Sequence, residues 1–303
     1  MNKVDLGGVF PPIPTPFGED GEVAYGALAE NLARWNAYEL RGYIVLGSNG
    51  EGVLLDPEEK SRVWEAARRA IAPGRLMIAG TGGESTRGTI ATTRRAADAG
   101  ADAALVVTPS YYKGKMNAAA LVAHYRAVAD ASPIPIMIYN LPGNTGVNVD
   151  AATVARIAEH PNVIGIKDTG GNITQLAETV HLAPATFQVL AGSANFLLAA
   201  LAVGAVGGVL ALANVAPDRS LELRRLFLEG RMEEAGALQR SVLALNAAVT
   251  SRFGIAGLKA ALDMLGYYGG PVRSPLLPLT EAERATVRDI VRDAGLVKGG
   301  EVA

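Results

Sequence analysis

The chain has 303 residues, of which 49% are hydrophobic and 19% are charged, the balance of a globular protein with a sizeable core. Its formal net charge of −2 argues against nucleic acid and against an anionic membrane as partners. There is no cysteine, which excludes disulfides and a cysteine nucleophile and fits a reducing cytoplasm.

The beginning of the chain lacks the basic and apolar blocks of a signal peptide. No run reaches the roughly 20 apolar residues of a membrane span. The most apolar stretch, residues 197–212, is interrupted by glycines. We therefore expect a cytoplasmic protein without a membrane partner.

Short apolar runs rich in Val and Ile alternate along the chain with helical stretches. They are continuously apolar, as expected for parallel strands that are covered on both faces. From the second run onward, their starts are separated by roughly the length of one β–α unit. The eight predicted strands are residues 8–13, 42–46, 76–79, 104–108, 134–139, 163–167, 188–191 and 206–210.

Helix-start signals follow most of these runs. Asp56 stands before Pro57 and two acidic residues, which is a typical helix beginning. Eight such units predict an α/β protein of the (β/α)8 TIM barrel type. An open doubly wound sheet would commonly carry a glycine fingerprint after its first strand, where this chain has a proline-rich segment, residues 11–17. The other predicted caps are Asn117, Asp150, Asn172 and Ser193.

After Asn214 the strand signal stops, and helices are predicted over residues 217–230, 232–251, 255–265 and 280–294. We expect the barrel, with the catalytic site, to occupy residues 1–215. Residues 216–303 are expected to form a C-terminal helical extension that makes oligomer contacts or acts as a lid.

Lys167 ends the buried strand predicted at residues 163–167. A charged, unpaired lysine is costly there, so burial favours the neutral amine. A neutral amine is a nucleophile that can form a Schiff base with a carbonyl substrate. The plainer alternative is a strand-end lysine that extends to solvent. The six other lysines fall in polar, helical or terminal segments: Lys3, Lys60, Lys113, Lys115, Lys259 and Lys298.

Tyr139 ends the strand before that of Lys167. In a barrel of this type the chemistry takes place at the carboxyl ends of the strands, so both side chains should face the same mouth. A tyrosine beside a Schiff-base lysine can transfer the protons that the reaction requires. The alternative is an aromatic residue that packs the barrel end.

The loop Gly47-Ser48-Asn49-Gly50 follows the second strand. Its backbone N–H groups could hold a carboxylate, although the same residues also make an ordinary turn. Glu51 could act as an acid or base, but a salt bridge that structures the loop is the favoured interpretation. Asp168 is interpreted as structural as well.

Other chemistries find less support. The three histidines, His124, His160 and His181, fall on predicted helices away from the strand ends, so a metal site is not expected. His124 and His160 are interpreted as surface or helix-end residues. Glycines in residues 80–83 indicate a close approach of backbone rather than a phosphate site. The chain also lacks the Gly-x-Ser-x-Gly elbow of serine hydrolases.

Three segments together carry a family resemblance. They are GSNGE at residues 47–51, YNLPGNTG at 139–146 and GIKD at 165–168. The chain resembles, along essentially its whole length, the class I pyruvate aldolase barrels, a superfamily that includes dihydrodipicolinate synthase and N-acetylneuraminate lyase. Within it, the chain looks most like the 4-hydroxy-2-oxoglutarate aldolases, on the basis of residues 103–116, 188–193, 212–215, 246–257 and 266–271.

The resemblance implies a role for each matching residue. Lys167 would form the imine, and Tyr139 would be the proton relay with Ser48 in its hydroxyl chain. Asn49 and the backbone of its loop, including Gly47, would hold the pyruvyl carboxylate. Thr169 stands where the similar aldolases have a serine and keeps the hydroxyl. The pyruvyl pocket would be lined by Gly192 and Val209.

The resemblance also implies an assembly. Tyr111 would reach the site of a neighbouring subunit, so we expect an obligate dimer within a homotetramer built as a dimer of dimers. No metal or organic cofactor is implied, because the iminium on Lys167 supplies the electron sink.

Asn144 distinguishes this chain from the dihydrodipicolinate synthases, which have an arginine there that binds the carboxylate of the incoming aldehyde. Without it the bidentate clamp is lost. We therefore expect a lyase that cleaves 4-hydroxy-2-oxoglutarate to pyruvate and glyoxylate. Three alternatives stay open: dihydrodipicolinate synthase, which joins pyruvate to aspartate semialdehyde; an aldolase or dehydratase for sugar-derived 2-oxo acids; and a non-catalytic pyruvate-binding scaffold.

Overall fold

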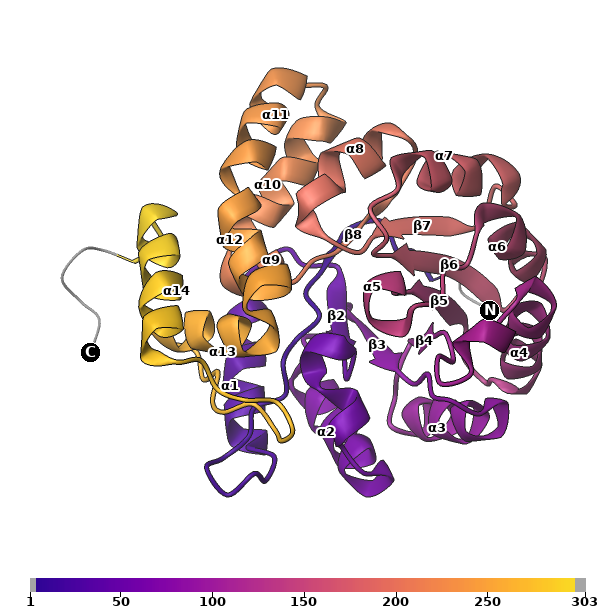
Figure 1. Ribbon diagram of the computed structural model, residues 1–303, viewed down its shortest axis with the longest axis horizontal. Coiled ribbons are helices and arrows are strands. Elements are labelled where there is room, and N and C mark those ends of the chain that lie inside the picture. The colour runs from indigo at the N-terminus through magenta and orange to yellow at the C-terminus, as the bar shows by residue number, and fades with distance from the viewer. Residues whose placement is uncertain (1–3, 298–303) are drawn as a thin grey trace.

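The computed structural model describes residues 4–297, and its centre is a barrel of eight parallel strands (Figure 1). Neighbouring strands pair in the order β1-β8-β7-β6-β5-β4-β3-β2. This arrangement, with helices between the strands, confirms the predicted (β/α)8 TIM barrel. The strands are β1 (Val9–Phe10), β2 (Gly42–Val45), β3 (Leu76–Gly80), β4 (Ala103–Val107), β5 (Ile136–Asn140), β6 (Val163–Asp168), β7 (Gln188–Ala191) and β8 (Gly207–Val209).

The barrel closes between the first two strands through the segment that follows β1. A parallel bridge joins Pro12 to Ile44, and the N–H of Ile13 donates to the carbonyl of Ile44 at 3.0 Å. Because Pro11 and Pro12 have no N–H, the ladder between β1 and β8 ends at Phe10. Both strands are therefore shorter than predicted.

The helices of the barrel begin largely at the predicted caps. The Asp56 carboxylate accepts from the N–H of Glu59 at 2.8 Å, and the Glu59 carboxylate accepts from the N–H of Asp56 at 2.9 Å, which is a complete capping box. The side chains of Asn117, Asp150 and Asn172 each accept a hydrogen bond from the backbone N–H three residues later, which is the first half of a capping box. These helices are α1 (Tyr25–Trp35), α2 (Pro57–Ala70), α3 (Thr86–Asp98), α4 (Ala118–Ala131), α5 (Pro142–Thr145), α6 (Ala151–Ala158), α7 (Ile173–Leu182), α8 (Leu197–Ala202) and α9 (Leu212–Val215).

The remaining helices gather on the side of the barrel next to α1, α8 and α9 (Figure 1). The single helix predicted over residues 232–251 is wrong, because the chain makes two α-helices there and then a π-helical turn, Ala248–Arg252. π-Turns inside helical segments are frequent at functional sites. The division of the chain at residue 215 stays a prediction. These helices are α10 (Pro217–Leu228), α11 (Met232–Ser241), α12 (Leu243–Ala247), α13 (Gly254–Met264) and α14 (Glu281–Asp293).

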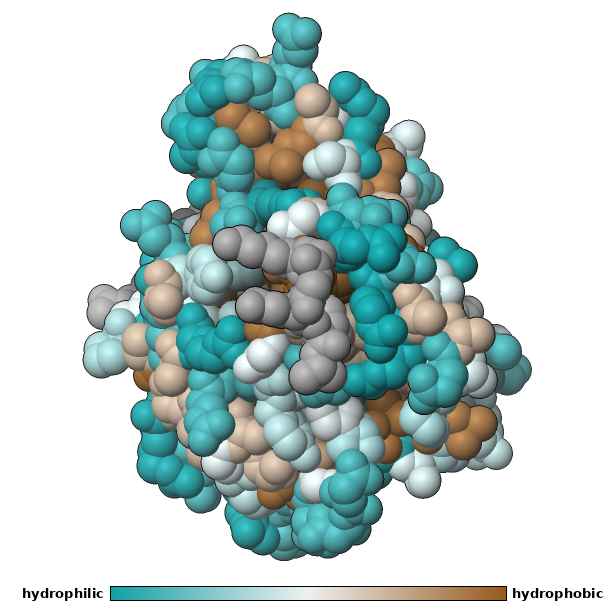
Figure 2. All heavy atoms as spheres, turned by 90° about the vertical axis from the view of Figure 1, so that its left-hand side faces the viewer, coloured by the Kyte–Doolittle hydropathy of each residue, from teal (hydrophilic) through white to brown (hydrophobic). Residues whose placement is uncertain are grey.

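The core has two layers. The larger cluster lies between the strands and the surrounding helices, and includes Trp35, Trp64 and Ile166. A smaller cluster contains alternate residues of the strands, among them Met137, Tyr139 and Val209. In residues 4–297 no helix combines the length and apolarity that a membrane span requires. The face that carries α14 is mostly hydrophilic, with a hydrophobic area toward the level of α11 (Figure 2).

Candidate active site

Lys167 and Tyr139 lie side by side at the carboxyl ends of neighbouring strands. They are register partners on β6 and β5, and the side-chain nitrogen of Lys167 is 4.0 Å from the centre of the Tyr139 ring. Both residues are buried, with exposed fractions of 4% and 5%. Ile166 belongs to the outer core layer, so strand alternation directs Lys167 into the barrel mouth.

A hydroxyl chain extends from Tyr139 to the loop after β2. The hydroxyl oxygens of Ser48 and Tyr139 are 3.1 Å apart, within hydrogen-bond distance. The loop is bracketed by Leu46 and Glu51, which have positive φ angles of 60° and 53°. They are the two non-glycine residues with positive φ in residues 4–297. Such strain costs about 1–3 kcal/mol per residue and tends to persist at functional sites.

These side chains border a cavity of about 580 Å³ at the barrel mouth. Pockets of about 300–1,000 Å³ hold small-molecule ligands, so the cavity has room for more than a three-carbon unit. Lys167 is the only charged side chain among its lining residues in the part of the chain that the structure describes. Of the predicted site residues, the cavity brings together Ser48, Asn49, Tyr139, Asn144, Lys167, Thr169 and Gly192.

Asn49 and Thr169 line this cavity from the carboxyl ends of two different strands, Asn49 after β2 and Thr169 after β6. The side-chain nitrogen of Asn49 is buried and has no hydrogen-bond partner within residues 4–297, so it is available to a ligand. The Thr169 hydroxyl donates to the carbonyl of Asn140 at 2.8 Å. A Cβ at Gly192 would lie 2.3 Å from Cγ2 of Thr169, so a side chain at this position would displace the threonine.

Three predicted site residues lie outside the large cavity. Val209 is completely buried in the small core cluster that also contains Tyr139. Gly47 borders a second, smaller cavity. Tyr111 lies on the loop after β4 with 79% of its surface exposed and lines neither of these cavities.

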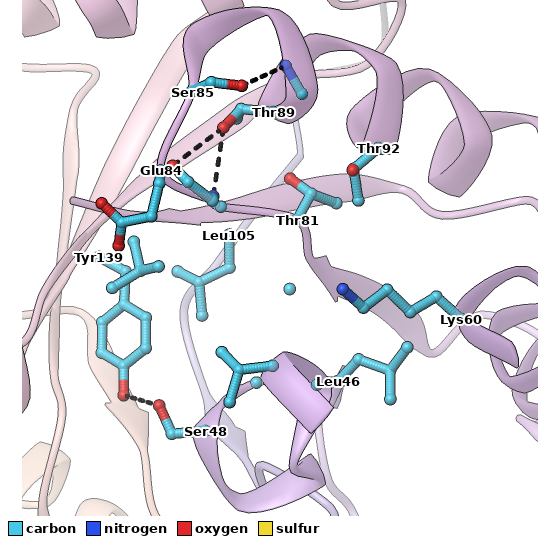
Figure 3. Close-up of a pocket in the computed structure, with 18 residues that line it drawn as sticks. Leu46, Ser48, Lys60, Thr81, Glu84, Ser85, Thr89, Thr92, Leu105 and Tyr139 are labelled. Carbon is cyan, nitrogen blue, oxygen red and sulfur yellow. Dashed lines mark hydrogen bonds between the residues drawn. The ribbon is translucent and has the colours of Figure 1, made fainter. Parts of the chain in front are cut away.

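The smaller cavity, of about 210 Å³, is bordered by Ser48 and Tyr139 on one side and by Thr81 and Glu84 on another (Figure 3). Ser48 and Tyr139 line both cavities, so their hydroxyl contact lies between the two spaces. Lys60 extends toward the centre of the smaller cavity from the side opposite Tyr139 (Figure 3).

Glu84, at the edge of the smaller cavity, anchors the loop that carries Tyr111. Its carboxylate accepts from the N–H groups of Ser110 at 2.9 Å and Tyr111 at 2.8 Å. Desolvation alone would raise the pKa of Glu84, but these hydrogen bonds outweigh it and lower the pKa. The carboxylate therefore stays charged and keeps its hold on the loop.

The favoured interpretation of Glu51 is confirmed, since its carboxylate makes a salt bridge. Its partner, Lys259 on α13, lies 2.6 Å away, and both side chains are almost fully buried. Lys259 also donates to the carbonyl of Pro271 at 2.7 Å, and the N–H of Arg273 donates to Glu51 at 2.8 Å. Burial lowers the pKa of Lys259, and the charge of Glu51 offsets part of that effect. Lys259 had been assigned only to a helical segment, although its apolar neighbours were a signal of burial.

The extension, for which the sequence predicts oligomer contacts or a lid, also borders the large cavity. The π-turn contributes Val249, Thr250 and Ser251, and the segment after α13 contributes Leu276 and Leu277. The periodic pattern of these helices carries no sign of which of their residues reach the barrel mouth.

His124 was expected at a surface or helix end, which is wrong: it is buried in α4 and shares a hydrogen bond of 2.9 Å with the Thr86 hydroxyl. Burial lowers the pKa of His124. His160 follows the end of α6, as expected, and pairs with Asp130. The Asp168 carboxylate accepts from Asn140 and from the N–H of Gly170, which confirms a structural role.

The loop after β3 is a close-approach loop, as expected. A Cβ at Gly80 would lie 2.2 Å from the carbonyl oxygen of Leu46, and one at Gly82 would lie 2.3 Å from the backbone nitrogen of Val107. Gly80 therefore lets the chain pass close to the backbone that leads to Ser48, and Gly82 lets it pass close to β4.

A TIM barrel with a lysine and a tyrosine paired at its mouth is the architecture of a class I, Schiff-base-forming lyase. A sequence model of the Dihydrodipicolinate synthetase family matches residues 5–294, and the chain belongs to that family. Enzymes of this family form a Schiff base between a lysine and pyruvate and use no metal or organic cofactor.

The relatives carry more than one activity. A 4-hydroxy-tetrahydrodipicolinate synthase of Methanothrix thermoacetophila is 38% identical over 94% of this chain and 95% of its own. A probable mitochondrial 4-hydroxy-2-oxoglutarate aldolase of Emericella nidulans is 36% identical over 95% and 94%. Among solved structures, the dihydrodipicolinate synthase of Acinetobacter baumannii complexed with pyruvate superimposes with a TM-score of 0.92 at 31% identity, covering 97% of this chain and 100% of its own.

Proposed function

We propose that this enzyme cleaves 4-hydroxy-2-oxoglutarate to pyruvate and glyoxylate through an imine on Lys167. The observation that carries the proposal is the pairing of the buried side-chain nitrogen of Lys167 with the ring of Tyr139, whose hydroxyl contacts Ser48. A nucleophilic amine beside a proton relay is what imine formation and collapse require.

The steps follow from these groups. The neutral amine of Lys167 attacks C2 of the substrate, and Tyr139 transfers protons while the carbinolamine loses water. The protonated imine then accepts the electrons of the C3–C4 bond as the C4 hydroxyl loses its proton and glyoxylate leaves. The resulting enamine takes up a proton at C3, and water releases pyruvate and restores the amine.

The neutral lining of the cavity supports this choice of substrate. Asn144 borders the cavity at the place where dihydrodipicolinate synthases have an arginine, and an amide does not offer the bidentate charged clamp of a guanidinium. The similarity to the Emericella aldolase points the same way.

A second candidate is condensation of pyruvate with aspartate semialdehyde. The 38% identity to the Methanothrix synthase favours it, and it uses the same imine. The two candidates differ only in the aldehyde that meets the pyruvyl enamine, so a comparison of aldehydes separates them.

The first experiment incubates the protein with pyruvate and sodium borohydride and then maps the modified peptide. We expect one pyruvyl adduct, on Lys167, and none in a folded Lys167→Ala variant, whose cleavage activity should fall to background. Condensation rates with glyoxylate and with aspartate semialdehyde then choose between the candidates. A folded wild-type protein without an adduct would reject the imine mechanism, and full activity in Lys167→Ala would do the same.

We also propose a homotetramer built as a dimer of dimers, in which Tyr111 reaches the site of a neighbouring subunit. The exposed position of Tyr111 on a loop held by Glu84 supports this. Tyr111→Phe should lower activity without changing the sedimentation of the protein. A monomer with full activity would contradict the proposal.

A further inference from the structure

We propose that Asn246, a buried residue of the C-terminal extension, is a positioning residue that aims Ser193 and Asn195 at the distal carboxylate of the substrate. The inference rests on the proposed function and concerns the half of the cavity that receives the aldehyde.

The cavity has a side that the pyruvyl unit does not need. Asn49, Tyr139 and Lys167 occupy the ends of β2, β5 and β6, while Ser193 and Asn195 belong to the loop after β7. The π-turn of the extension lines the cavity as well. A second reactant, or the distal half of a longer substrate, has room there.

Asn246 on α12 is completely buried and directs its amide to this loop. Its side-chain nitrogen donates to the hydroxyl oxygen of Ser193 at 3.1 Å and to the side-chain oxygen of Asn195 at 2.9 Å. Both hydrogens of the amide are thereby used, on two residues that line the cavity. The π-turn begins two residues later, and the Thr250 hydroxyl within it donates to the carbonyl of Asn246.

Ser193 and Asn195, which line the cavity, each keep a hydrogen-bond donor that no described residue uses. The Ser193 oxygen accepts from Asn246 and from the N–H of Asn195 at 3.3 Å, so the hydroxyl hydrogen is left to donate. The oxygen of Asn195 accepts from Asn246, so its NH₂ group is left as well. Neither donor has an acceptor within residues 4–297.

Another residue of the extension holds the backbone of the same loop. Gln239 on α11 donates to the carbonyl of Ala194 at 2.7 Å and accepts from the N–H of Leu198 at 3.1 Å. The loop is thus fixed independently, and Asn246 sets only the direction of the two side chains.

Two neighbouring hydrogen-bond donors suit a carboxylate, whose oxygens only accept hydrogen bonds. Because Lys167 is the only charged side chain lining this cavity in residues 4–297, the second negative charge of a dicarboxylate would be met by these neutral donors. Ser193 and Asn195 would therefore hold the distal carboxylate of 4-hydroxy-2-oxoglutarate, which becomes the carboxylate of glyoxylate after cleavage.

The test separates the two halves of the cavity. Asn246→Ala should change the rate of borohydride trapping of pyruvate on Lys167 by less than about twofold, since that step does not use the aldehyde side. It should lower kcat/KM for 4-hydroxy-2-oxoglutarate about tenfold or more, mainly through KM, as expected when a hydrogen bond to a charged group is lost. Condensation with glyoxylate should fall relative to condensation with acetaldehyde, which has no carboxylate.

Asn31→Ala is the matched control, because Asn31 is also buried and bonds only the backbone of Tyr268. Asn195→Ala is a second variant, used in case Asn246→Ala does not fold, because Asn195 is exposed. It should also lower condensation with glyoxylate relative to condensation with acetaldehyde. If both cavity variants keep the wild-type preference for glyoxylate over acetaldehyde, or lose trapping and cleavage equally, the inference is overturned. Absence of an adduct in the wild type would instead reject the proposed function.

Discussion

The carboxylate of Glu51 lies 2.6 Å from the ammonium of Lys259, and the two side chains are 0% and 1% exposed. This pair joins the loop that presents Ser48 and Asn49 to helix α13 of the extension. The loop leaves β2 through Leu46 in a strained conformation and is held at its other end by a buried charge pair.

Breaking this pair should destabilise the fold. Removing one partner of a buried ion pair leaves an uncompensated charge, which costs about 3–5 kcal/mol. We expect Lys259→Met to lower the free energy of unfolding by about that amount, measured by urea denaturation. The double variant Glu51→Gln/Lys259→Met should regain part of the loss, since neither charge is then left alone.

The exposed pair Arg95–Glu58 supplies the control for this experiment. Its side chains are 48% and 74% exposed, so Glu58→Gln should cost at most about 1 kcal/mol. If Glu58→Gln and Lys259→Met lowered the free energy of unfolding equally, burial of the Glu51–Lys259 pair would not account for its contribution to stability.

The Tyr139 hydroxyl should be needed for turnover. Tyr139→Phe keeps the ring beside Lys167 but removes the proton relay, and we expect kcat for cleavage to fall by about 10²–10⁴. Tyr125→Phe is the matched control, because Tyr125 is buried and donates to the carbonyl of Val106. It should lose about 1 kcal/mol of stability and keep its activity. A Tyr139→Phe enzyme with wild-type kcat would remove Tyr139 from the mechanism.

A methyl group at Gly192 should disturb the site through Thr169. The added Cβ would overlap Cγ2 of Thr169 at 2.3 Å and the carbonyl of Asp168 at 2.7 Å. We expect Gly192→Ala to cost about 1–3 kcal/mol in unfolding free energy and to raise KM for pyruvate in the trapping assay. Gly26→Ala, on α1 where no neighbouring atom lies within 4 Å, should be neutral or gain up to about 1 kcal/mol.

Acid should weaken the link between α2 and the segment after α13. Hydrogen bonds from Arg273 lower the pKa of Glu59 below its ordinary value of 4.5. Because the folded-state pKa is the lower one, the pair stabilises the fold above the ordinary value, and this contribution is lost as the pH falls through the folded-state value. Glu59→Gln should be less stable than wild type at neutral pH. Its unfolding free energy should decline less steeply between about pH 5 and pH 3.

The eight strands and their sequence in the barrel could be predicted because each strand is encoded by a short, contiguous run of apolar residues. Continuous Val and Ile runs identified the strands, and the rule that parallel strands end at one rim placed Tyr139 beside Lys167. The short β1 shows the limit of that reasoning, since the apolar run from Gly8 continues into prolines that cannot donate to a ladder.

The contributions of the extension could not be predicted in the same way. Asn246 bonds Ser193 and Asn195 across 53 and 51 residues of chain, and Lys259 meets Glu51 across more than 200. No periodic pattern encodes such pairings, because helical spacing reports only which face is apolar. The break of the predicted helix at the π-turn has the same origin: its five residues include no Gly or Pro that would indicate an interruption, and most of the cavity they border is formed by distant parts of the chain.

The bonds from Asn246, Gln239 and Lys259 to the barrel loops bear on how such enzymes can be recombined. A chimera that joins this barrel to the helical extension of another family member would keep these bonds only if that extension carried the same amides and the same ammonium at these places. The substrate preference of the barrel could not then be transferred by exchanging strand ends alone. The extension and the rim loops would have to be transferred together, as one unit.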